Sequence, residues 1–513
     1  MTELFAAKTK ESGRIDTLLH QIRHQEDLRK TLSELRAVIK EKKQHEKVRE
    51  LLNEGELITP LLLSEDAKVR KNAAALLGDL QIQNAAQQLY LAYQKEETLF
   101  VRGTILGALE KVNPYPYLSE LQEQYELLCK KEIPEHEKKH TREEMRILER
   151  ILRKEGKETR HTFIGWEEKL VILLTTNGKY QNLTTEKLSA DHKKETALGV
   201  QAVVDDLRKV TAIRTFRELL FPIRLDRTVS FEDGPEVFGE ALADSKLLPL
   251  LERCHKEPAP FYFRIELKGG FTLEERSRYI KRAAFAIEEK SSRKLINAPE
   301  DYEFEIRLLL DKTRKIHVFL KMFTIPMERF AYRKGTIAAS MHPSMAAMIM
   351  ELARPWLKEK AQILDPCCGV GTMLVERHKL LPAREIYGID IFGEAVEKAR
   401  VNTAEAGMHV NFIHRDYLDF KHEYMFDEII ANMPIRGKRT KEEQDLFYKG
   451  FFDKSEELLA PGGILILYSN ENGFVKKQIR LHPAFKLCQE FLIREKEQFY
   501  VYVIGCRKDG FVE

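Results

Sequence analysis

Four polar side chains in the last third of the chain each follow a short apolar run with the length of a buried strand. They are Asp365, Asp390, Asp416 and Asn432. Because parallel strands bring their carboxyl ends to one edge of a sheet, we expect these side chains to lie close together. Carboxylates accept hydrogen bonds, and an amide both donates and accepts. Packing alone explains the three carboxylates poorly, since a buried carboxylate without a donor is costly.

A glycine-containing turn accompanies the first of these residues. In the segment 365–372, Asp-Pro-Cys-Cys-Gly-Val-Gly-Thr, a strand ends and a helix begins. Gly369 and Gly371 let a ligand approach the backbone closely, although such a turn alone also serves to pack a helix on a strand. Asp390 is placed to accept both hydroxyls of a ribose, and Asp416 to accept from the exocyclic amine of adenine. The combination predicts a ligand site at these strand ends.

The elements that position these residues alternate between short apolar strands and helices over residues 331–513, which is typical of a parallel, doubly wound sheet. The pattern also predicts a strand at 464–468, directly after two glycines, and a closing strand at 498–504. The closing strand is apolar enough for the interior or the edge of a sheet. We therefore expect a Rossmann-like α/β domain here.

Residues 159–330 have the pattern of an α+β region. Buried or alternating apolar runs predict strands, and one long amphipathic segment predicts a helix. The expected strands are 169–176, 201–204, 261–267, 302–309 and 315–320, and the expected helix is 273–290.

Residues 1–158 are rich in helix-forming residues and contain few glycines, so we expect an all-helical domain. Within it, residues 69–77 and 101–109 align with a shift of 32 residues, which resembles HEAT-type helical hairpins; an irregular helical bundle is the alternative. Residues 130–160 are dominated by charged side chains, a composition expected of a solvated helix or linker that adds nothing to a core. We place the domain boundary there.

Length and composition agree with a soluble protein of about three domains. The chain has 513 residues, and its 84 Lys and Arg against 81 Asp and Glu give a net charge of +3. A nucleic-acid partner would therefore have to meet a local basic patch. The six cysteines form no metal-ligand or disulfide pattern, so we expect no metal site and a reducing, cytoplasmic environment. No signal peptide and no membrane-spanning run is expected.

Together, these motifs resemble the S-adenosylmethionine-dependent methyltransferases that modify exocyclic amino nitrogens. More narrowly, residues 332–505 resemble the THUMP-associated RNA methyltransferases that form N2-methylguanosine in RNA. Residues 432–439 and 447–452 are more similar to the tRNA-modifying branch than to the rRNA branch. The resemblance implies a cofactor site for S-adenosylmethionine, made by Ser340, His342, Pro343, Asp365, Cys367, Gly369, Gly371, Thr372, Asp390, Ile391, Asp416 and Tyr417.

The resemblance also implies a catalytic role for Asn432, Met433, Pro434 and Ile435. The exocyclic amine of guanine is a poor nucleophile, because its lone pair is delocalised into the ring. Hydrogen bonds from its protons to the Asn432 amide oxygen and to a Met433 or Pro434 carbonyl favour a more tetrahedral nitrogen, so positioning does most of the work. Relatives carry Tyr or Phe where Ile435 stands, and they use it to stack on the extruded base.

The middle region resembles the ferredoxin-like subdomain and the THUMP domain that grip RNA in this family. Basic residues on or near the expected helix and after the Asn-Met-Pro-Ile motif are candidates for phosphate contacts, although a solvated helix face explains single ones equally well. These candidates are Arg276, Arg278, Lys281, Arg282, Arg436, Lys438 and Arg439.

The sequence thus predicts a methyltransferase of an exocyclic base nitrogen in RNA, favouring guanine N2 of tRNA. The alternatives are an rRNA guanine-N2 or an adenine-N6 methyltransferase, and a non-catalytic RNA-binding adaptor that keeps the cofactor fold. The helical first third is expected to recruit RNA or a protein.

Overall fold

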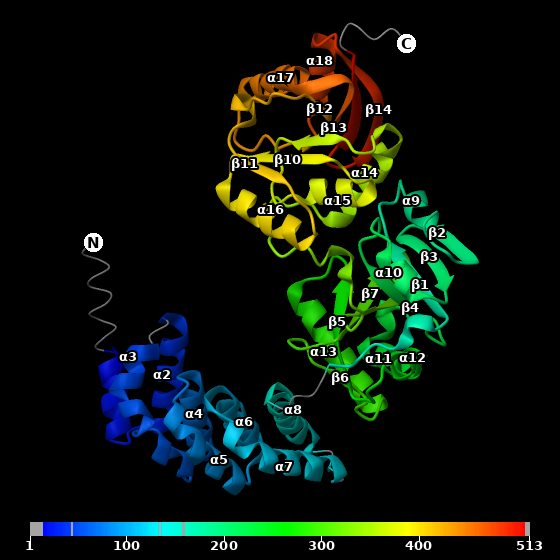
Figure 1. The fold of residues 1–513 in the computed structure, drawn as a ribbon. Coiled ribbons are helices and arrows are strands. Elements are labelled where there is room, and N and C mark those ends of the chain that lie inside the picture. Colours follow the sequence, from blue (N-terminus) through cyan, green and yellow to red (C-terminus); the bar gives the residue numbers. More distant parts are fainter. Residues whose placement is uncertain (1–13, 43–44, 132, 135, 156–159, 508–513) are drawn as a thin grey trace. The chain divides into compact units, whose positions relative to one another are not determined.

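The computed structural model describes residues 14–42, 45–131, 133–134, 136–155 and 160–507. The chain divides into two compact units, residues 1–159 and residues 160–513, and each is described by itself (Figure 1). The described residues include no helix that is long and apolar enough to cross a membrane.

The first unit contains only helices in its described part. Helices α4 and α6 contain the two similar segments of the sequence, and they pack closely because Gly78 lies directly against Ala108. Residues 14–23 are helical, and the helices that follow are α2 (Leu28–Lys42), α3 (His45–Leu51), α4 (Ala67–Asp79), α5 (Ala86–Lys95), α6 (Leu99–Val112), α7 (Leu118–Lys130) and α8 (Lys138–Glu155).

Helix α8 corrects the expectation that the charged segment 130–160 adds nothing to a core. Leu148 and Ile151 are fully buried in the core of the helical unit, and Met145 is nearly so. Between the charged residues of this segment, apolar residues recur at helical spacing and form a stripe that packs against the preceding helices. The expectation was wrong because the composition of a segment does not reveal apolar residues that recur at helical spacing.

The middle of the chain forms an eight-stranded mixed sheet in the order β2-β3-β1-β4-β8-β7-β5-β6. Antiparallel pairing of β4 with β8 joins two four-stranded halves into this one sheet. The strands are β1 (Leu170–Thr175), β2 (His192–Thr196), β3 (Gly199–Val204), β4 (Leu219–Ile223), β5 (Phe261–Lys268), β6 (Leu295–Asn297), β7 (Phe304–Leu310) and β8 (Ile316–Met322), and the helices are α9 (Asn182–Thr185), α10 (Leu207–Ala212), α11 (Pro235–Ala243), α12 (Leu247–Cys254) and α13 (Leu273–Lys290).

Three of these strands are absent from the sequence expectations, each for an identifiable reason. Strand β4 contains Pro222, which argues against a central strand, yet Pro222 pairs with Phe319 of β8. Strand β2 consists of exposed polar residues, a composition suited to an edge strand. Strand β6 has only three residues.

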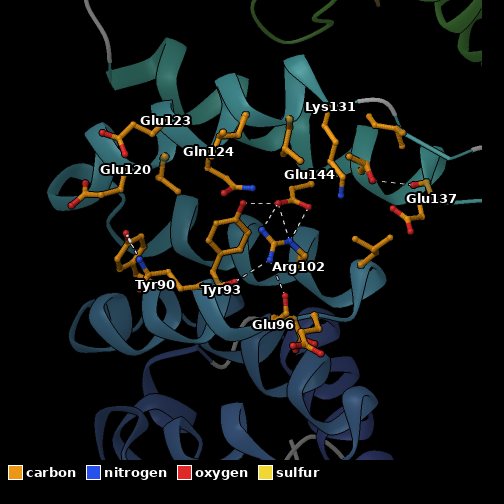
Figure 2. A pocket seen from close by; sticks show the side chains of 18 residues that line it. Tyr90, Tyr93, Glu96, Arg102, Glu120, Glu123, Gln124, Lys131, Glu137 and Glu144 are labelled. Carbon is orange, nitrogen blue, oxygen red and sulfur yellow. Dashed lines mark hydrogen bonds and ion pairs between the residues drawn. The ribbon is translucent and has the colours of Figure 1, made fainter.

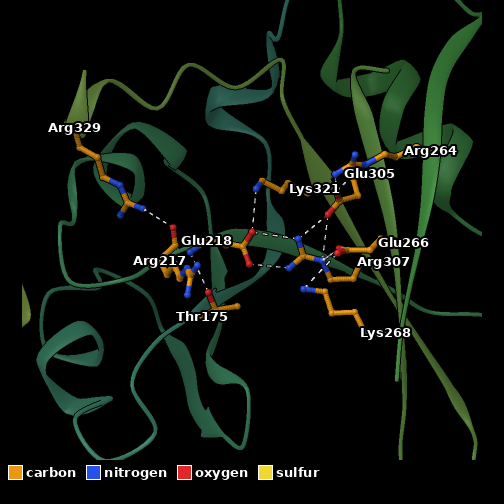
Figure 3. A network of polar contacts seen from close by, with 10 residues as sticks. All are labelled: Thr175, Arg217, Glu218, Arg264, Glu266, Lys268, Glu305, Arg307, Lys321 and Arg329. Atoms are coloured by element: carbon orange, nitrogen blue, oxygen red, sulfur yellow. Dashed lines mark hydrogen bonds and ion pairs between the residues drawn. The ribbon is translucent and has the colours of Figure 1, made fainter. Parts of the chain in front are cut away.

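One face of the middle sheet carries a network of ion pairs (Figure 3). Arg307 donates to Glu218 at 2.7 Å and to Glu305 at 2.6 Å, and Lys321 donates to Glu218 at 2.9 Å. Burial alone would raise the pKa of Glu218, but the hydrogen bonds from Arg307 and Lys321 lower it to about 2. The cations of this face are therefore neutralised within the sheet.

The last third forms a seven-stranded sheet in the order β11-β10-β9-β12-β13-β15-β14. The first five strands are parallel as expected, whereas β15 and β14 are antiparallel to their neighbours. The closing strand β15 lies inside the sheet. The strands are β9 (Gln362–Asp365), β10 (Glu385–Asp390), β11 (Asn411–His414), β12 (Phe426–Asn432), β13 (Leu459–Ser469), β14 (Phe485–Arg494) and β15 (Phe499–Cys506), and the helices are α14 (Pro343–Ala353), α15 (Thr372–Leu380), α16 (Gly393–Glu405), α17 (Lys441–Leu458) and α18 (Asn472–Leu481).

A fully buried ion pair joins α15 to β12. Arg377 donates to both carboxylate oxygens of Glu428, at 2.7 and 2.8 Å, and both side chains are 0% exposed. Arg377 also donates to the carbonyl of Lys358, whose own backbone N–H donates to Glu428 at 2.8 Å. The pair is satisfied on all sides, so each charge depends on the other.

We predict that Glu428→Gln or Arg377→Met alone lowers the free energy of unfolding by about 3–5 kcal/mol, because each leaves a buried charge without its partner. Arg377→Met combined with Glu428→Gln should lose less than either single change. Urea denaturation measures both. The exposed pair of Lys449 with Asp453 supplies the control, since Lys449→Met should cost about 1 kcal/mol or less. Additive losses in the double variant would contradict the interpretation.

Candidate functional site

The strand ends of the seven-stranded sheet gather the polar residues that the sequence singled out. Strand β10 pairs with β9 so that Gly388 lies opposite Asp365, and β12 pairs with β9 on its other side. Asp365, Asp390 and Asn432 are the last residues of β9, β10 and β12. The strand order reverses between β9 and β12, which is where ligands bind in doubly wound folds.

The carboxylate of Asp390 holds the glycine turn in place. Its two oxygens accept the backbone N–H groups of Gly369 at 2.8 Å and of Phe392 at 2.9 Å. Gly369 and Gly371 both have left-handed backbone angles, with φ of 51° and 78°. A side chain built at Gly369 would meet open space, so the turn leaves room beside it. Ile391 is 54% exposed at the same edge.

Asp365 is buried and only half satisfied. One carboxylate oxygen accepts the N–H of Cys367 at 3.0 Å, and the other oxygen is buried without a hydrogen-bond partner among the described residues. The hydroxyl of Thr372, in the first turn of α15, is likewise buried and without a partner. Burial, and secondarily the charge of Asp390, raises the pKa of Asp365 to about 8. Such an orphan acceptor is well suited to a cationic donor.

Asp416 lies two residues beyond the end of β11, which stops at His414. It caps a short 3-10 turn by accepting the N–H of Leu418 at 2.9 Å, and its carboxylate is exposed. The adjacent Tyr417 points into the core, where its hydroxyl bonds Ser455 at 3.0 Å. Only the backbone of Tyr417 is therefore available to a ligand at this edge.

The nearby carboxylates create a negative electrostatic potential at Cys367. Burial first, and then the charges of Asp365, Asp390 and Asp416, raise the pKa of the Cys367 thiol. Cys367 therefore stays protonated at neutral pH and is a poor nucleophile. The described residues contain no cluster of three or more His, Cys, Asp or Glu that could hold a metal ion.

The Asn-Met-Pro-Ile segment leaves β12 at the same edge. The backbone N–H of Met433 donates to the carbonyl of Tyr468 at 3.0 Å, which ties the segment to β13, and the Met433 side chain is buried. Asn432 and Pro434 are partly exposed, whereas Ile435 is 67% exposed. The segment thus presents an amide, two carbonyls and one apolar side chain.

The segment before α14 contributes the cap of that helix. His342 caps α14 by accepting the N–H of Ser344, and Pro343 occupies the first turn. The hydroxyl of Ser340 accepts a backbone N–H from the preceding turn at 2.9 Å. Burial, and then nearby arginines led by Arg217, lower the pKa of His342 to about 4. His342 is therefore neutral at physiological pH.

Asn402, on α16, is a site residue that the sequence interpretation missed. Its amide donates to the carbonyls of Gly335 and Val370, both at 3.0 Å, and its oxygen accepts the N–H of Gly335 at 2.9 Å. It therefore ties the segment before α14 to the glycine turn. The available signal was an asparagine inside a helix, where that residue type is a weak helix former.

Glu376, on α15, links the methyltransferase-like sheet to the middle region. Arg214 donates to both of its carboxylate oxygens at 2.7 and 2.8 Å, and the hydroxyl of Tyr332 donates to one of them at 2.7 Å. Glu376 is 2% exposed. A lone carboxylate in the apolar run of α15 was the signal that could have revealed this contact.

The predicted RNA contacts lie on separate elements. On α13, Arg278 pairs with Glu274 at 2.7 Å and Arg282 pairs with Glu236 at 2.5 Å. The remaining candidates are distributed as follows: Arg276 is half-buried and Lys281 exposed on α13, Arg436 and Lys438 are exposed after β12, and Arg439 packs over the ring of Phe447 at 4.6 Å.

Comparisons with known proteins show what the domain that contains this site is similar to. Residues 343–503 match the family model described as Methyltransferase small domain. The chain is 28% identical over 156 residues to the U6 snRNA (guanine-N(2))-methyltransferase THUMPD2 of Bos taurus. The matched segment covers 30% of this chain and 30% of that relative. The matched segment thus spans less than a third of the relative's length.

Two solved structures share the fold over about two thirds of this chain. TrmN from Thermus thermophilus is 20% identical, with a TM-score of 0.50 that covers 66% of this chain and 99% of TrmN. SMU.472, named as a methyltransferase and solved in complex with SAH, is 17% identical, with a TM-score of 0.51 that covers 69% of this chain and 100% of that protein. Over residues 343–503, this chain therefore contains a methyltransferase domain with a Rossmann-like fold.

Proposed function

We propose that the protein is an S-adenosylmethionine-dependent RNA methyltransferase that acts on an exocyclic base nitrogen, guanine N2 in the first place. The observation that carries the proposal is the meeting of the half-satisfied Asp365, the glycine turn held by Asp390, and Asn432 at one edge of the sheet. The bovine relative, whose name specifies guanine N2 of an RNA, supports the choice of base and polymer.

The residues present suit the cofactor. The free oxygen of Asp365 and the hydroxyl of Thr372 are buried acceptors beside the turn, and the space at Gly369 is open. Each oxygen of Asp390 has one lone pair left for a ribose hydroxyl, and the exposed Asp416 can accept from an adenine amine. S-adenosylmethionine supplies a methyl group activated by attachment to a sulfonium. The local excess of carboxylates favours such a cation.

The chain itself orients the nucleophile. The Asn432 amide oxygen and the carbonyl of Met433 or Pro434 accept the two protons of the exocyclic amine, which favours a tetrahedral nitrogen. No strong base is required, because the nitrogen becomes acidic as the new bond forms and can release its proton to water. The lowered pKa of His342 makes it a weak base, and the raised pKa of Cys367 keeps its thiol protonated, so neither group is a strong base at this site.

By the resemblance of the Asn-Met-Pro-Ile motif, Ile435 corresponds to a position that is aromatic in the family. A stacked aromatic contributes about 1–3 kcal/mol per base, whereas an exposed isoleucine offers dispersion contacts only. The adjacent Arg436 is exposed and supplies a planar guanidinium that can pack on a base face. We infer that this chain holds its target base less tightly than relatives with an aromatic residue.

The remaining assignments are part of the same proposal. Residues 159–330 act as a ferredoxin-like and THUMP-like RNA grip, with Arg276 and Lys281 of α13 free of the carboxylate pairs that engage Arg278 and Arg282. Residues 1–158 form a HEAT-like helical domain. The motif at 432–439 favours tRNA as the substrate. An rRNA guanine-N2 or adenine-N6 activity and a non-catalytic adaptor are the competing possibilities.

We predict that S-adenosylmethionine binding is lost in Asp390→Ala, because the substitution removes both the ribose acceptors and the anchor of Gly369. Calorimetry should show at least a hundredfold weaker binding. Asp419→Ala, which removes a carboxylate beside the same edge, should bind normally. Full-strength binding by Asp390→Ala would contradict the assignment of this site.

We predict that cofactor affinity rises with pH up to about pH 8. Asp365 has a pKa of about 8 in the free protein, and the cationic cofactor binds its ionised form, so binding releases a proton below that pH. Affinity should therefore fall by nearly tenfold per pH unit below pH 7. The measurement is calorimetry at pH 6, 7 and 8. Asp365→Asn should remove this dependence, and a similar pH profile in both proteins would contradict it.

We predict that Asn432→Ala lowers methyl transfer by at least a hundredfold while cofactor binding is kept, because the change removes only the acceptor for the amine. Nucleoside mass spectrometry of tRNA, rRNA and small RNA from a deletion strain should reveal one missing methylated nucleoside. The wild-type gene should restore it, and Asn432→Ala should not. Asn411→Ala is the matched control. If no nucleoside is missing, the adaptor is favoured.

A further inference from the structure

The helical first unit contains a groove of about 710 Å³ between α5, α6, α7 and α8. Tyr90 and Tyr93 form its floor (Figure 2), and both are largely buried. Leu127, at the rim, is 64% exposed. A second, smaller hollow shares Glu96 and Glu97 with it. The groove therefore has an aromatic floor and an exposed apolar side chain at its rim.

The charged residues of the groove are mainly acidic. Six glutamates line it, against two cations, Arg102 and Lys131. Glu96 is neutralised by Arg70, which bonds both of its oxygens at 2.7 Å. The other carboxylates of the lining are Glu97, Glu120, Glu123, Glu137 and Glu144.

Arg102 is paired within the wall of the groove. It donates to the carboxylate of Glu144 at 2.7 Å and to the backbone carbonyl of Glu96 at 2.8 Å, while the hydroxyl of Tyr93 also donates to Glu144 at 2.5 Å. Burial alone would lower the pKa of Arg102, but the hydrogen bond to Glu144 and the charge of Glu144 raise it, so the guanidinium stays charged. Most of the Arg102 donors are therefore engaged by Glu144 and by backbone carbonyls.

The outer carboxylates keep their negative charge uncompensated. Glu97, Glu120 and Glu123 are exposed, and no cation pairs with them in the described structure. Burial raises the pKa of Tyr90, and the charges of Glu120 and Glu123 raise it further, so their field reaches the floor of the groove. An RNA backbone would be repelled here, whereas a cationic side chain would be attracted.

We propose that this groove docks a segment of a partner protein that carries lysine or arginine side chains between aliphatic ones. The aliphatic side chains pack on Tyr90 and Leu127, and the cations lie against Glu97, Glu120 and Glu123. The helical unit then recruits a protein, while RNA is met by the second unit. This inference is independent of the proposed methyl transfer, because none of its residues lies in the methyltransferase domain.

The test measures fluorescence anisotropy of a labelled eight-residue peptide of alternating arginine and leucine, titrated with the full chain. The peptide should bind, and binding should weaken as salt rises from 50 to about 500 mM, because these are surface charges. Glu120→Lys combined with Glu123→Lys should weaken binding by about tenfold or more. Leu127→Ser should also weaken it, which tests the apolar part separately.

Glu50→Lys combined with Glu126→Lys is the matched control, since it makes the same change in net charge outside the groove. It should leave peptide binding unchanged. The proposal is overturned if the peptide does not bind, if the control loses as much affinity as the groove variant, or if an eight-nucleotide oligouridine displaces the peptide from the groove. Circular dichroism verifies that each variant is folded. Cofactor calorimetry, which reports on the other unit, is independent of all these outcomes.

Discussion

The hydrogen bond from the backbone N–H of Gly369 to the carboxylate of Asp390 is the contact on which the site depends. It joins the loop after β9 to the end of β10. The ends of these two strands and the start of α15 are therefore fixed relative to one another. The turn can pass this close to a carboxylate only because Gly369 and Gly371 adopt left-handed angles that side chains disfavour. The room at Gly369 is a consequence of the same backbone path.

Two further polar anchors extend this geometry outward. Asn402 joins the glycine turn to the segment before α14, and Glu376 joins α15 to Arg214 of the middle region. Both side chains are buried and fully hydrogen-bonded, so breaking either contact leaves unpaired polar groups in the interior. Such contacts specify one arrangement more than they add stability. They set how the RNA grip meets the catalytic edge in the proposed function.

The near-neutral total charge of +3 results from regions with opposite local character. The strand ends of the methyltransferase domain concentrate carboxylates. In the middle sheet, Arg307 is paired internally with Glu218 and Glu305 and is not available to a phosphate (Figure 3). The groove of the helical unit is acidic (Figure 2). The net charge does not describe which charged side chains are paired locally. These local ion pairs decide whether a surface attracts an anionic or a cationic partner.

The sequence alone determined the strand-to-helix turn at 365–372 and the strand ends at Asp390 and Asn432, because apolar runs and glycines are local signals. It also predicted helix α13 from its amphipathic spacing, and the structure shows a capping box of Thr272 and Glu275 at the start of that helix. The sequence did not predict strand β4, because Pro222 disfavours a strand locally. This strand is stabilised by its pairing with β1 and β8.

Only the tertiary structure decided which polar residues meet. Asn402 and Glu376 bond partners that lie 67 and 162 residues away along the chain, and no local pattern encodes such pairs. Local sequence likewise does not reveal which carboxylates neutralise basic residues such as Arg102 and Arg307, because their partners belong to other elements. Residue type and spacing thus reveal which groups are available for chemistry, whereas long-range packing decides which of them remain free to perform it.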